Sequence, residues 1–94
     1  MQKIDKKASE KLFKAILALK NPSECLAFFE DICTIQELEA LTQRLEVACL
    51  LNKGKSYIDI NKETGASTAT ICRVSKCLNY GAGGYKTAIE RLED

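Results

Sequence analysis

One glycine, Gly65, constrains the fold of this chain more than any other residue. It separates two short helical patterns in the stretch from Ser56 to Leu78. Glycine adopts positive φ without steric cost, so the chain can end one helix here and turn sharply into the next. Ser56 and Ser67 each precede one of the patterns and are residues of the type that caps a helix N-terminus. The spacing therefore predicts a helix-turn-helix over residues 56–78.

The apolar residues on both sides of the turn recur at helical intervals and are expected to pack together. The expected packing set is Tyr57, Ile60, Ala66, Ile71 and Val74. The opposite side of the second helix then points outward, with short side chains first and cationic ones farther on. This order suits a helix that enters the major groove of DNA end-first, with bases ahead and phosphates beside it. The outward face comprises Thr68, Ala69, Cys72, Arg73 and Lys76, and Ser67 precedes it as the cap.

The charges are distributed unevenly, although the net charge of the chain is only +1. Residues 53–76 carry five cations against two acids, whereas residues 23–46 carry six acids against one arginine. Such asymmetry is typical of a protein with one surface for an anionic polymer and another for a different contact. Lys55 and Lys62 join Lys76 as candidate phosphate contacts, which add affinity but carry no sequence information.

Two residues depart from the usual helix-turn-helix pattern. Asn61 stands where the motif commonly has a small alanine, at the closest approach of the two helices, and Thr64 is unusually polar for the position before the turn. Both weaken the interpretation when it rests on the pattern alone.

Two further helices are expected near the start of the chain. Apolar residues recur at intervals of three and four over residues 8–19, which predicts a helix with one broad apolar face. Asn21 is suited to cap a second helix with Pro22 at its first position, where the missing amide costs nothing. The stripe expected to be buried on the second helix is Cys25, Phe28, Phe29 and Ile32.

The longest helix is expected to open at Thr34, which forms a capping box with Glu37, and to end near Leu51. Its apolar stripe is wide and predicts a place in the middle of the core: Leu38, Leu41, Leu45, Ala48 and Leu51, with Val47 and Leu50 on the flank. A last helix follows a glycine-rich turn, with Tyr85, Ala88, Ile89 and Leu92 on one face. No stretch alternates in the manner of a strand. The prediction is an all-α fold of six helices in a single domain, residues 1–94.

The composition excludes several classes of function. The chain has no histidine and no Cys-x-x-Cys pair, which removes the usual zinc sites and the thioredoxin type of redox pair. Without histidine or clustered carboxylates there is no general acid–base pair to assign, so an enzyme is not expected. No apolar run approaches the ~20 residues that span a bilayer. No membrane partner is therefore expected.

The five cysteines are odd in number and fall within helical patterns, which argues against a disulfide framework and for a cytoplasmic protein. Cys25, Cys49 and Cys77 are expected in the core as small hydrophobes. Cys72 lies instead on the outward face beside Arg73. It is interpreted as a small neutral contact residue, and the alternative is a redox-sensitive thiol.

Beyond these patterns, the string G-A-S-T-A-T-I-C-R, from Gly65 to Arg73, resembles the start of the recognition helix in the Trp repressor family. Residues at the start of the long central helix match the same family. The segments F-F-E-D-I-C-T-I-Q-E-L at residues 28–38 and C-L-N-Y-G-A-G-G-Y at residues 77–85 resemble its YerC/YecD branch. The central-helix matches are Thr34, Glu37, Ala40, Leu41 and Arg44.

The resemblance implies an intertwined all-helical homodimer. The flanking helices, at residues 8–52 and 85–93, would form one core from both copies, and the two helix-turn-helix units would act as reading heads for a palindromic operator. It also implies a ligand role for Arg44 and Arg73, which match the two arginines that hold the indole of tryptophan in the Trp repressor. A salt bridge to a glutamate such as Glu46 is the alternative for Arg44.

The match at the ligand site is incomplete. Val74 stands where the Trp repressor has glycine and Cys77 where it has serine, which implies a partly filled and differently lined pocket. Tryptophan is therefore disfavoured as the effector, and another small molecule is the alternative.

Two functions follow as hypotheses. The first is a homodimeric, sequence-specific DNA-binding transcriptional regulator, a repressor by resemblance. The alternative is a helical protein-interaction module that has lost DNA binding, in which the acidic helices and the wide apolar surface would serve a protein partner.

Overall fold

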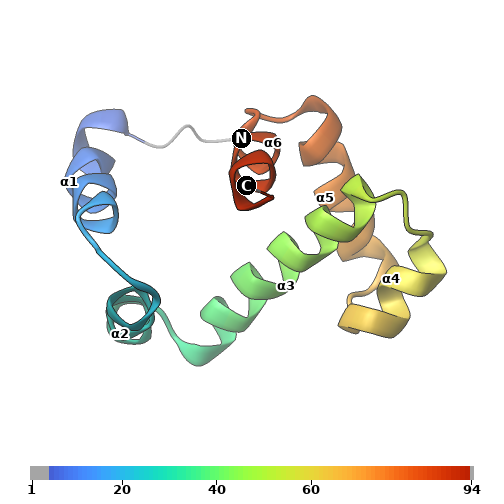
Figure 1. Cartoon of the computed structure of the whole chain (residues 1–94), viewed down its shortest axis with the longest axis horizontal. Helices are drawn as coiled ribbons and strands as arrows, with labels where there is room; N and C mark the ends of the chain where they lie inside the picture. Colours follow the sequence, from blue (N-terminus) through green and yellow to red (C-terminus); the bar gives the residue numbers. More distant parts are fainter. Residues whose placement is uncertain (1–4, 94) are drawn as a thin grey trace. The chain divides into compact units, whose positions relative to one another are not determined.

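The computed structural model describes residues 5–93 and forms, over that range, six α-helices and no strand. The prediction of an all-α, six-helix chain is confirmed (Figure 1). The chain divides into two compact units, Met1–Leu38 and Glu39–Asp94, so the first residues of the third helix belong to the first unit. The helices are α1 (Lys6–Leu17), α2 (Pro22–Ile32), α3 (Ile35–Asn52), α4 (Tyr57–Thr64), α5 (Thr68–Tyr80) and α6 (Gly84–Leu92).

Two N-caps that the sequence predicted are formed before α2 and α3. The Asn21 side chain accepts a hydrogen bond from the Glu24 amide at 2.9 Å. Thr34 and Glu37 make the reciprocal capping box: the Glu37 amide donates to Thr34 Oγ1 at 3.1 Å, and the Thr34 amide donates to Glu37 Oε1 at 2.8 Å. These bonds, first the backbone one, hold the pKa of the exposed Glu37 carboxyl below its ordinary value.

Helix α1 begins two residues earlier than the apolar pattern suggested. Asp5 caps it, because its carboxylate accepts from the amides of Lys7 and Ala8. Ser9 lies one turn inside the helix and donates from Oγ to the Asp5 carbonyl at 2.9 Å. Side-chain capping therefore set the start of this helix, whereas periodicity marked only where its apolar residues begin.

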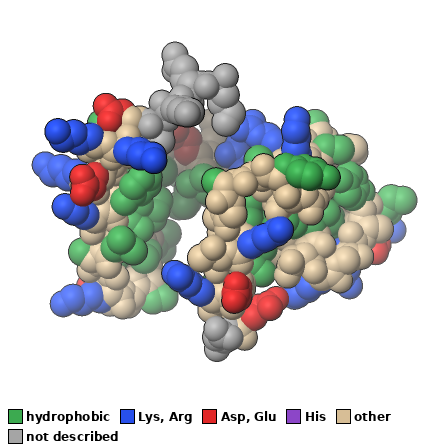
Figure 2. All heavy atoms as spheres, turned by 90° about the horizontal axis from the view of Figure 1, so that it is seen from above, with side chains coloured by type: hydrophobic (Ala, Val, Ile, Leu, Met, Phe, Trp, Pro, Cys, Tyr) green, Lys and Arg blue, Asp and Glu red, His purple; other side chains and the backbone are tan. Residues whose placement is uncertain are grey.

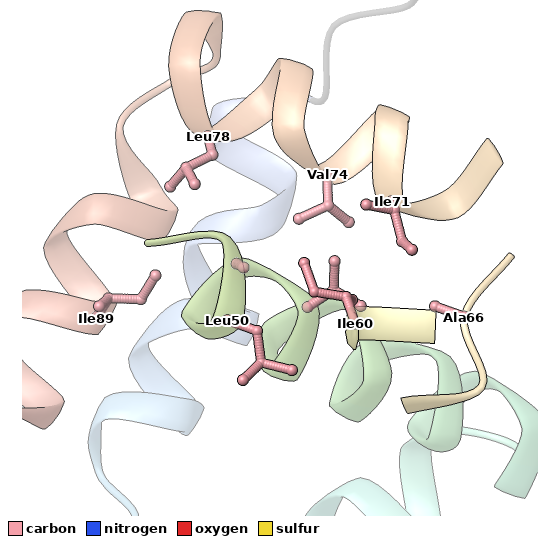
Figure 3. Close-up of a cluster of buried hydrophobic side chains, with 9 residues drawn as sticks. Leu50, Ile60, Ala66, Ile71, Val74, Leu78 and Ile89 are labelled. Carbon is pink, nitrogen blue, oxygen red and sulfur yellow. The ribbon is translucent and has the colours of Figure 1, made fainter. Parts of the chain in front are cut away.

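The second unit has one hydrophobic cluster built by four helices. Helix α5 packs against both α4 and α6, and Ile71 and Val74 point from α5 toward Ile60 of α4 (Figure 3). Ile60 and Ile71 are completely buried. The buried members are Val47, Ala48 and Leu50 of α3, Ile60 of α4, Ala66 of the turn, Ile71, Val74 and Leu78 of α5, and Ile89 of α6.

The burial of α3 corrects one expectation. Val47 and Leu50, which were placed on the flank of its apolar stripe, lie in the cluster, while Leu41 and Leu45 of the stripe itself remain exposed. The cluster forms on the side of α3 that carries Val47 and Leu50. Tyr57 is a second correction: it was expected in the helix-turn-helix core but is 40% exposed.

The first unit has almost no buried side chains. Ser9 is the only buried residue of α1, and α2 has none. The stripe predicted to be buried on α2 is therefore only half covered, and Cys25 too is half-buried. Phe28 and Phe29 are half-buried and meet edge to face with ring centroids 5.5 Å apart, but Ile32 is exposed. No described residue of α2 is fully buried.

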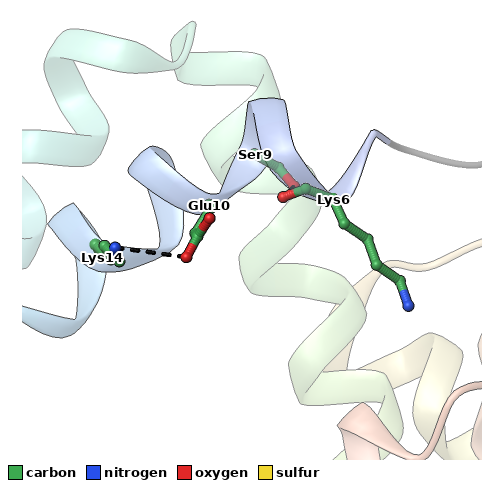
Figure 4. A network of polar contacts seen from close by, with 4 residues as sticks. All are labelled: Lys6, Ser9, Glu10 and Lys14. Carbon is green, nitrogen blue, oxygen red and sulfur yellow. Dashed lines mark hydrogen bonds and ion pairs between the residues drawn. The ribbon is translucent and has the colours of Figure 1, made fainter.

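Helix α1 is strongly two-sided. Its lysines gather on one side and hydrophobic side chains on the other (Figure 2, left). The Lys14 ammonium lies 3.4 Å from the Glu10 carboxylate one turn away, an exposed pair that contributes little stability (Figure 4). Leu17, the last residue of the helix, is 84% exposed. Among the described helices, none is long and apolar enough to cross a membrane.

Candidate nucleic-acid interface

The turn between α4 and α5 has the geometry that the sequence predicted. Ser56 Oγ accepts from the Asp59 amide at 3.1 Å and caps α4, and Ser67 Oγ accepts from the Thr70 amide at 3.2 Å and caps α5. Gly65 has φ 73°, the left-handed conformation that glycine adopts without strain. Its amide donates to the Asn61 carbonyl at 2.8 Å and closes the end of α4. The helix-turn-helix is formed as expected.

Burial of one side of α5 leaves the opposite side free. Ile71, Val74 and Leu78 lie in the hydrophobic cluster. All five residues assigned to the outward face are exposed: Thr68, Ala69, Cys72, Arg73 and Lys76. Ser67 is exposed too, but its hydroxyl is already engaged as the cap and also donates to Thr70 Oγ1. The Ser67 side chain is therefore held by the helix start.

The cations around this face are not neutralised by the chain's own carboxylates. Lys55 and Lys62 are exposed, as are Arg73 and Lys76. Over residues 5–93 the one ion pair is between Lys14 and Glu10, in α1. Unpaired, solvated cations are available to an external anion without first breaking an internal contact.

The two departures from the motif, Asn61 and Thr64, both have partners in the turn. Asn61 Nδ2 donates to the Ala66 carbonyl at 2.8 Å. Thr64 Oγ1 donates to the Ile60 carbonyl at 2.7 Å and accepts from the Ala66 amide at 3.1 Å. Gln43 of α3 donates from Nε2 to the Thr64 carbonyl at 3.2 Å. Polar residues that weakened the motif on pattern alone thus form hydrogen bonds that support it.

A pocket of ≈ 310 Å³ opens beside α5. It brings together Arg44 and Arg73, the two arginines that the resemblance singled out, from α3 and α5. Val74 is both a wall of the pocket and, at 2% exposure, a member of the hydrophobic cluster. The complete lining is Arg44, Ala69, Thr70, Arg73, Val74, Cys77 and Tyr85.

Three lining residues, Ala69, Thr70 and Tyr85, were not assigned to the pocket from the sequence. Thr70 lies three residues before Arg73 on the same helix, so helical spacing was a usable signal for it. Tyr85 comes from α6 and could be placed there only by the packing of α6 on α5. The lining contains no carboxylate, so the two guanidinium groups meet no opposing charge within it. The pocket is suited to an anionic or hydrogen-bonding guest.

The cysteines are free thiols, all five of them. Cys77 was expected in the core but is exposed, because it lies on the side of α5 that opens to the pocket. Cys25 and Cys49 are half-buried. Cys72 lies on the outward face, as its helical position predicted.

The family model described as Trp repressor protein matches residues 7–93. The YerC protein of Bacillus subtilis (strain 168), which is uncharacterised, is 50% identical over 94 residues, covering 100% of this chain and 90% of that protein.

Two solved structures have the same fold. A protein from Staphylococcus aureus, provisionally described as a Trp repressor, superposes with a TM-score of 0.89 and 45% identity, covering 93% of this chain and 87% of that one. A TrpR-like protein from Eubacterium eligens ATCC 27750 also has a TM-score of 0.89, with 54% identity and coverage of 93% and 90%. By sequence and by fold, the chain belongs to the Trp repressor family.

Proposed function

We propose that this protein is a homodimeric, sequence-specific DNA-binding transcriptional regulator, acting as a repressor at a palindromic operator. Family membership supports a regulatory role. The observation that carries the proposal is the exposed face of α5, which presents Thr68 and Ala69 at its start and Arg73 and Lys76 farther along, with no internal ion pair among these described residues.

The face divides by chemistry into reading and anchoring residues. Thr68 and Ala69 are short enough to let the helix end approach base edges, where a hydroxyl or methyl group meets an acceptor or a thymine methyl. Cys72 adds a small neutral contact. The cations Arg73, Lys76, Lys55 and Lys62 are suited to phosphates, which position the protein and dominate affinity.

Homodimerisation is supported by the exposed apolar side chains of the first unit and of α3. Phe13, Leu17, Leu26 and Ile35 are each about half exposed or more. Exposed apolar surface on this scale is characteristic of an interface. A second copy would supply the missing cover and would present two reading heads, as a palindromic site requires.

The pocket supports regulation by a small effector. Arg44 and Arg73 offer two planar guanidinium groups to an anion, and no carboxylate of the lining competes for them. Val74 occupies part of the space beside Arg73, so the proposed effector differs from tryptophan in shape or in charge.

Selection of bound sequences from random DNA tests the function directly. The selection is run with the protein alone and with tryptophan or other small carboxylates. We expect a palindromic site whose affinity falls steeply with salt, because phosphate contacts release counterions. Negligible binding at low salt under every condition would reject the DNA-binding function. A stoichiometric protein partner captured by crosslinking in cells would then favour the interaction module.

The reading face is tested with Thr68→Glu. A carboxylate at the head of α5 meets base edges and phosphates, so affinity for the selected site should fall about ten- to a hundredfold. Thr87→Glu is the matched control, because Thr87 is an exposed threonine in the first turns of another helix, α6. Equal loss in both variants would contradict the assignment of the face.

A further inference from the structure

The start of α5 is linked to α3 and α4 by a small set of side-chain hydrogen bonds, here called the turn network. It consists of Gln43, Asn61, Thr64 and the backbone of Ala66. Three of its bonds end on the backbone of the turn itself: Gln43 to the Thr64 carbonyl, Asn61 to the Ala66 carbonyl, and the Ala66 amide to Thr64 Oγ1.

The network satisfies backbone groups that helix geometry leaves without partners. Thr64 is the last residue of α4, so its carbonyl has no partner within that helix, and Gln43 provides one from α3. Ala66 is not part of either helix, and both of its backbone groups are bound by side chains. Its own side chain is 1% exposed, in the hydrophobic cluster. Ala66 is therefore fixed from two directions, by packing and by hydrogen bonds.

The direction of α5 depends on this residue, because Ala66 is followed at once by the cap Ser67 and then by the first turn of the helix. If Ala66 moved, Thr68 and Ala69 would move with it. The anchor on α3, Gln43, comes directly before Arg44, which lines the pocket, but Gln43 itself does not line it. None of the bonds in the network involves a group that lines the pocket. The network and the pocket lining are therefore made of different residues.

We propose that Gln43, Asn61 and Thr64 are positioning residues that set the direction of α5 before any ligand binds, so that the reading head is pre-formed. The consequence for DNA binding rests on the proposed function. A pre-formed head avoids the reduction in affinity that follows when only a fraction of the molecules has the binding-competent geometry. In this protein the effector would then adjust a head that is already ordered.

The proposal is tested first without DNA, by amide hydrogen exchange of Ala66 measured residue by residue by NMR. Thr64→Val removes the hydroxyl and keeps the shape, so the Ala66 amide should exchange about three- to tenfold faster, in line with the loss of one hydrogen bond. Thr64→Ser keeps the hydroxyl and should restore slow exchange. Neither substitution changes Ala66 or Gly65, so the intrinsic exchange rate is the same in both.

Asn61 is tested by two variants and a matched control. Asn61→Ala removes the donor, and Asn61→Asp replaces it by an acceptor of similar size that faces the Ala66 carbonyl, so Asn61→Asp should speed exchange at least as much as Asn61→Ala. If Asn61 only filled space, Asn61→Asp, which keeps its size, would speed exchange of the Ala66 amide less than Asn61→Ala. Asn79→Ala is the control, because Asn79 also donates to a backbone carbonyl, that of Ser75 at 2.9 Å, but inside α5 and away from the turn.

DNA affinity for a selected site is measured second, with Gln43→Ala and Asn61→Ala. Both should weaken binding about three- to tenfold while Asn79→Ala leaves it unchanged. Unchanged exchange at Ala66 in Thr64→Val and Asn61→Ala, or equal acceleration in Asn79→Ala, would overturn the turn network. Accelerated exchange in a protein that binds no DNA would instead reject the proposed function and leave the network standing.

Discussion

The helices of both units have the same amphipathic pattern, but only the second unit buries its apolar residues in a cluster. In residues 39–94 apolar residues from four helices meet in one cluster, and Ile60 and Ile71 are completely buried. In residues 1–38 the helices are just as regularly patterned, yet Ser9 is the only buried residue that the structure describes there. An amphipathic helix shows that a face will be covered, but it does not show by what.

The contrast separates what this chain stabilises alone from what it offers to a partner. The second unit contains α5 and has a hydrophobic cluster of its own. The first unit leaves large apolar side chains in water, which is costly unless another surface covers them. Self-association through the first unit is therefore the proposal that the contrast supports most directly.

The largest effect is expected from Leu17→Asp, which places a charge in the dimer interface proposed for the first unit and should raise the dimer dissociation constant. If a second copy buries Leu17, removal of that burial costs about 1.5–3 kcal/mol per copy, hence about 3–6 kcal/mol per dimer and roughly a hundred- to ten-thousandfold in the dimer dissociation constant. Sedimentation equilibrium over a range of concentrations measures it. Tyr80→Asp, an equally exposed site in the second unit, is the control. A dimer unaffected by Leu17→Asp would show that this face is not the interface.

The second largest effect is expected on the free energy of unfolding, from a substitution in the hydrophobic cluster of the second unit. Ile71→Ala should lower the free energy of unfolding by about 2–5 kcal/mol, because it leaves a cavity in a completely buried position. Ile58→Ala, at a site that is 70% exposed, should stay within about 0.5 kcal/mol. Denaturant unfolding followed by circular dichroism gives both values. Similar losses in the two variants would mean that α5 is not buried as described.

A smaller effect is expected at the turn. Gly65→Ala forces an L residue into φ 73°, and nothing lies within 4 Å of the added Cβ, so the cost is conformational alone, about 1–2 kcal/mol. Gly84→Ala meets equally open space at the start of α6 without positive φ, and should be neutral or slightly stabilising. Thermal unfolding compares the two. A neutral Gly65→Ala would show that the turn does not need this backbone conformation.

The smallest effect lies at the start of α3, where the first unit ends. The pKa of Glu37 is lowered by its bonds to Thr34, so the ionised carboxylate favours the folded state. This contribution is present above the ordinary value of 4.5 and is lost as the pH falls through the lower, folded-state pKa. Glu37→Gln should flatten the stability profile in that acidic range, measured by unfolding at a series of pH values. Glu39→Gln is the control, and an identical flattening there would contradict the capping role.

In the candidate site, local sequence patterns predicted the exposed face of α5 better than they predicted the pocket. The exposed face of α5 was predicted residue by residue, because the positions of Ile71 and Val74 on a helix determine what lies opposite. Four residues of the pocket, Arg44, Arg73, Val74 and Cys77, were expected there only because of the family resemblance. Tyr85 joins them from a separate helix, and no local rule relates residues 73 and 85.

The sequence by itself determined the local features of this protein: the six helices, the caps at Asn21, Thr34, Ser56 and Ser67, and the turn at Gly65. Each depends on groups within about one helical turn, so a short stretch contains the whole cause. Only the tertiary structure decided that α3 buries Val47 and Leu50 and exposes Leu41, and that Gln43 of α3 donates a hydrogen bond to the Thr64 carbonyl at the turn. Those outcomes depend on which faces of distant helices meet, and apolar periodicity on one helix does not contain that information.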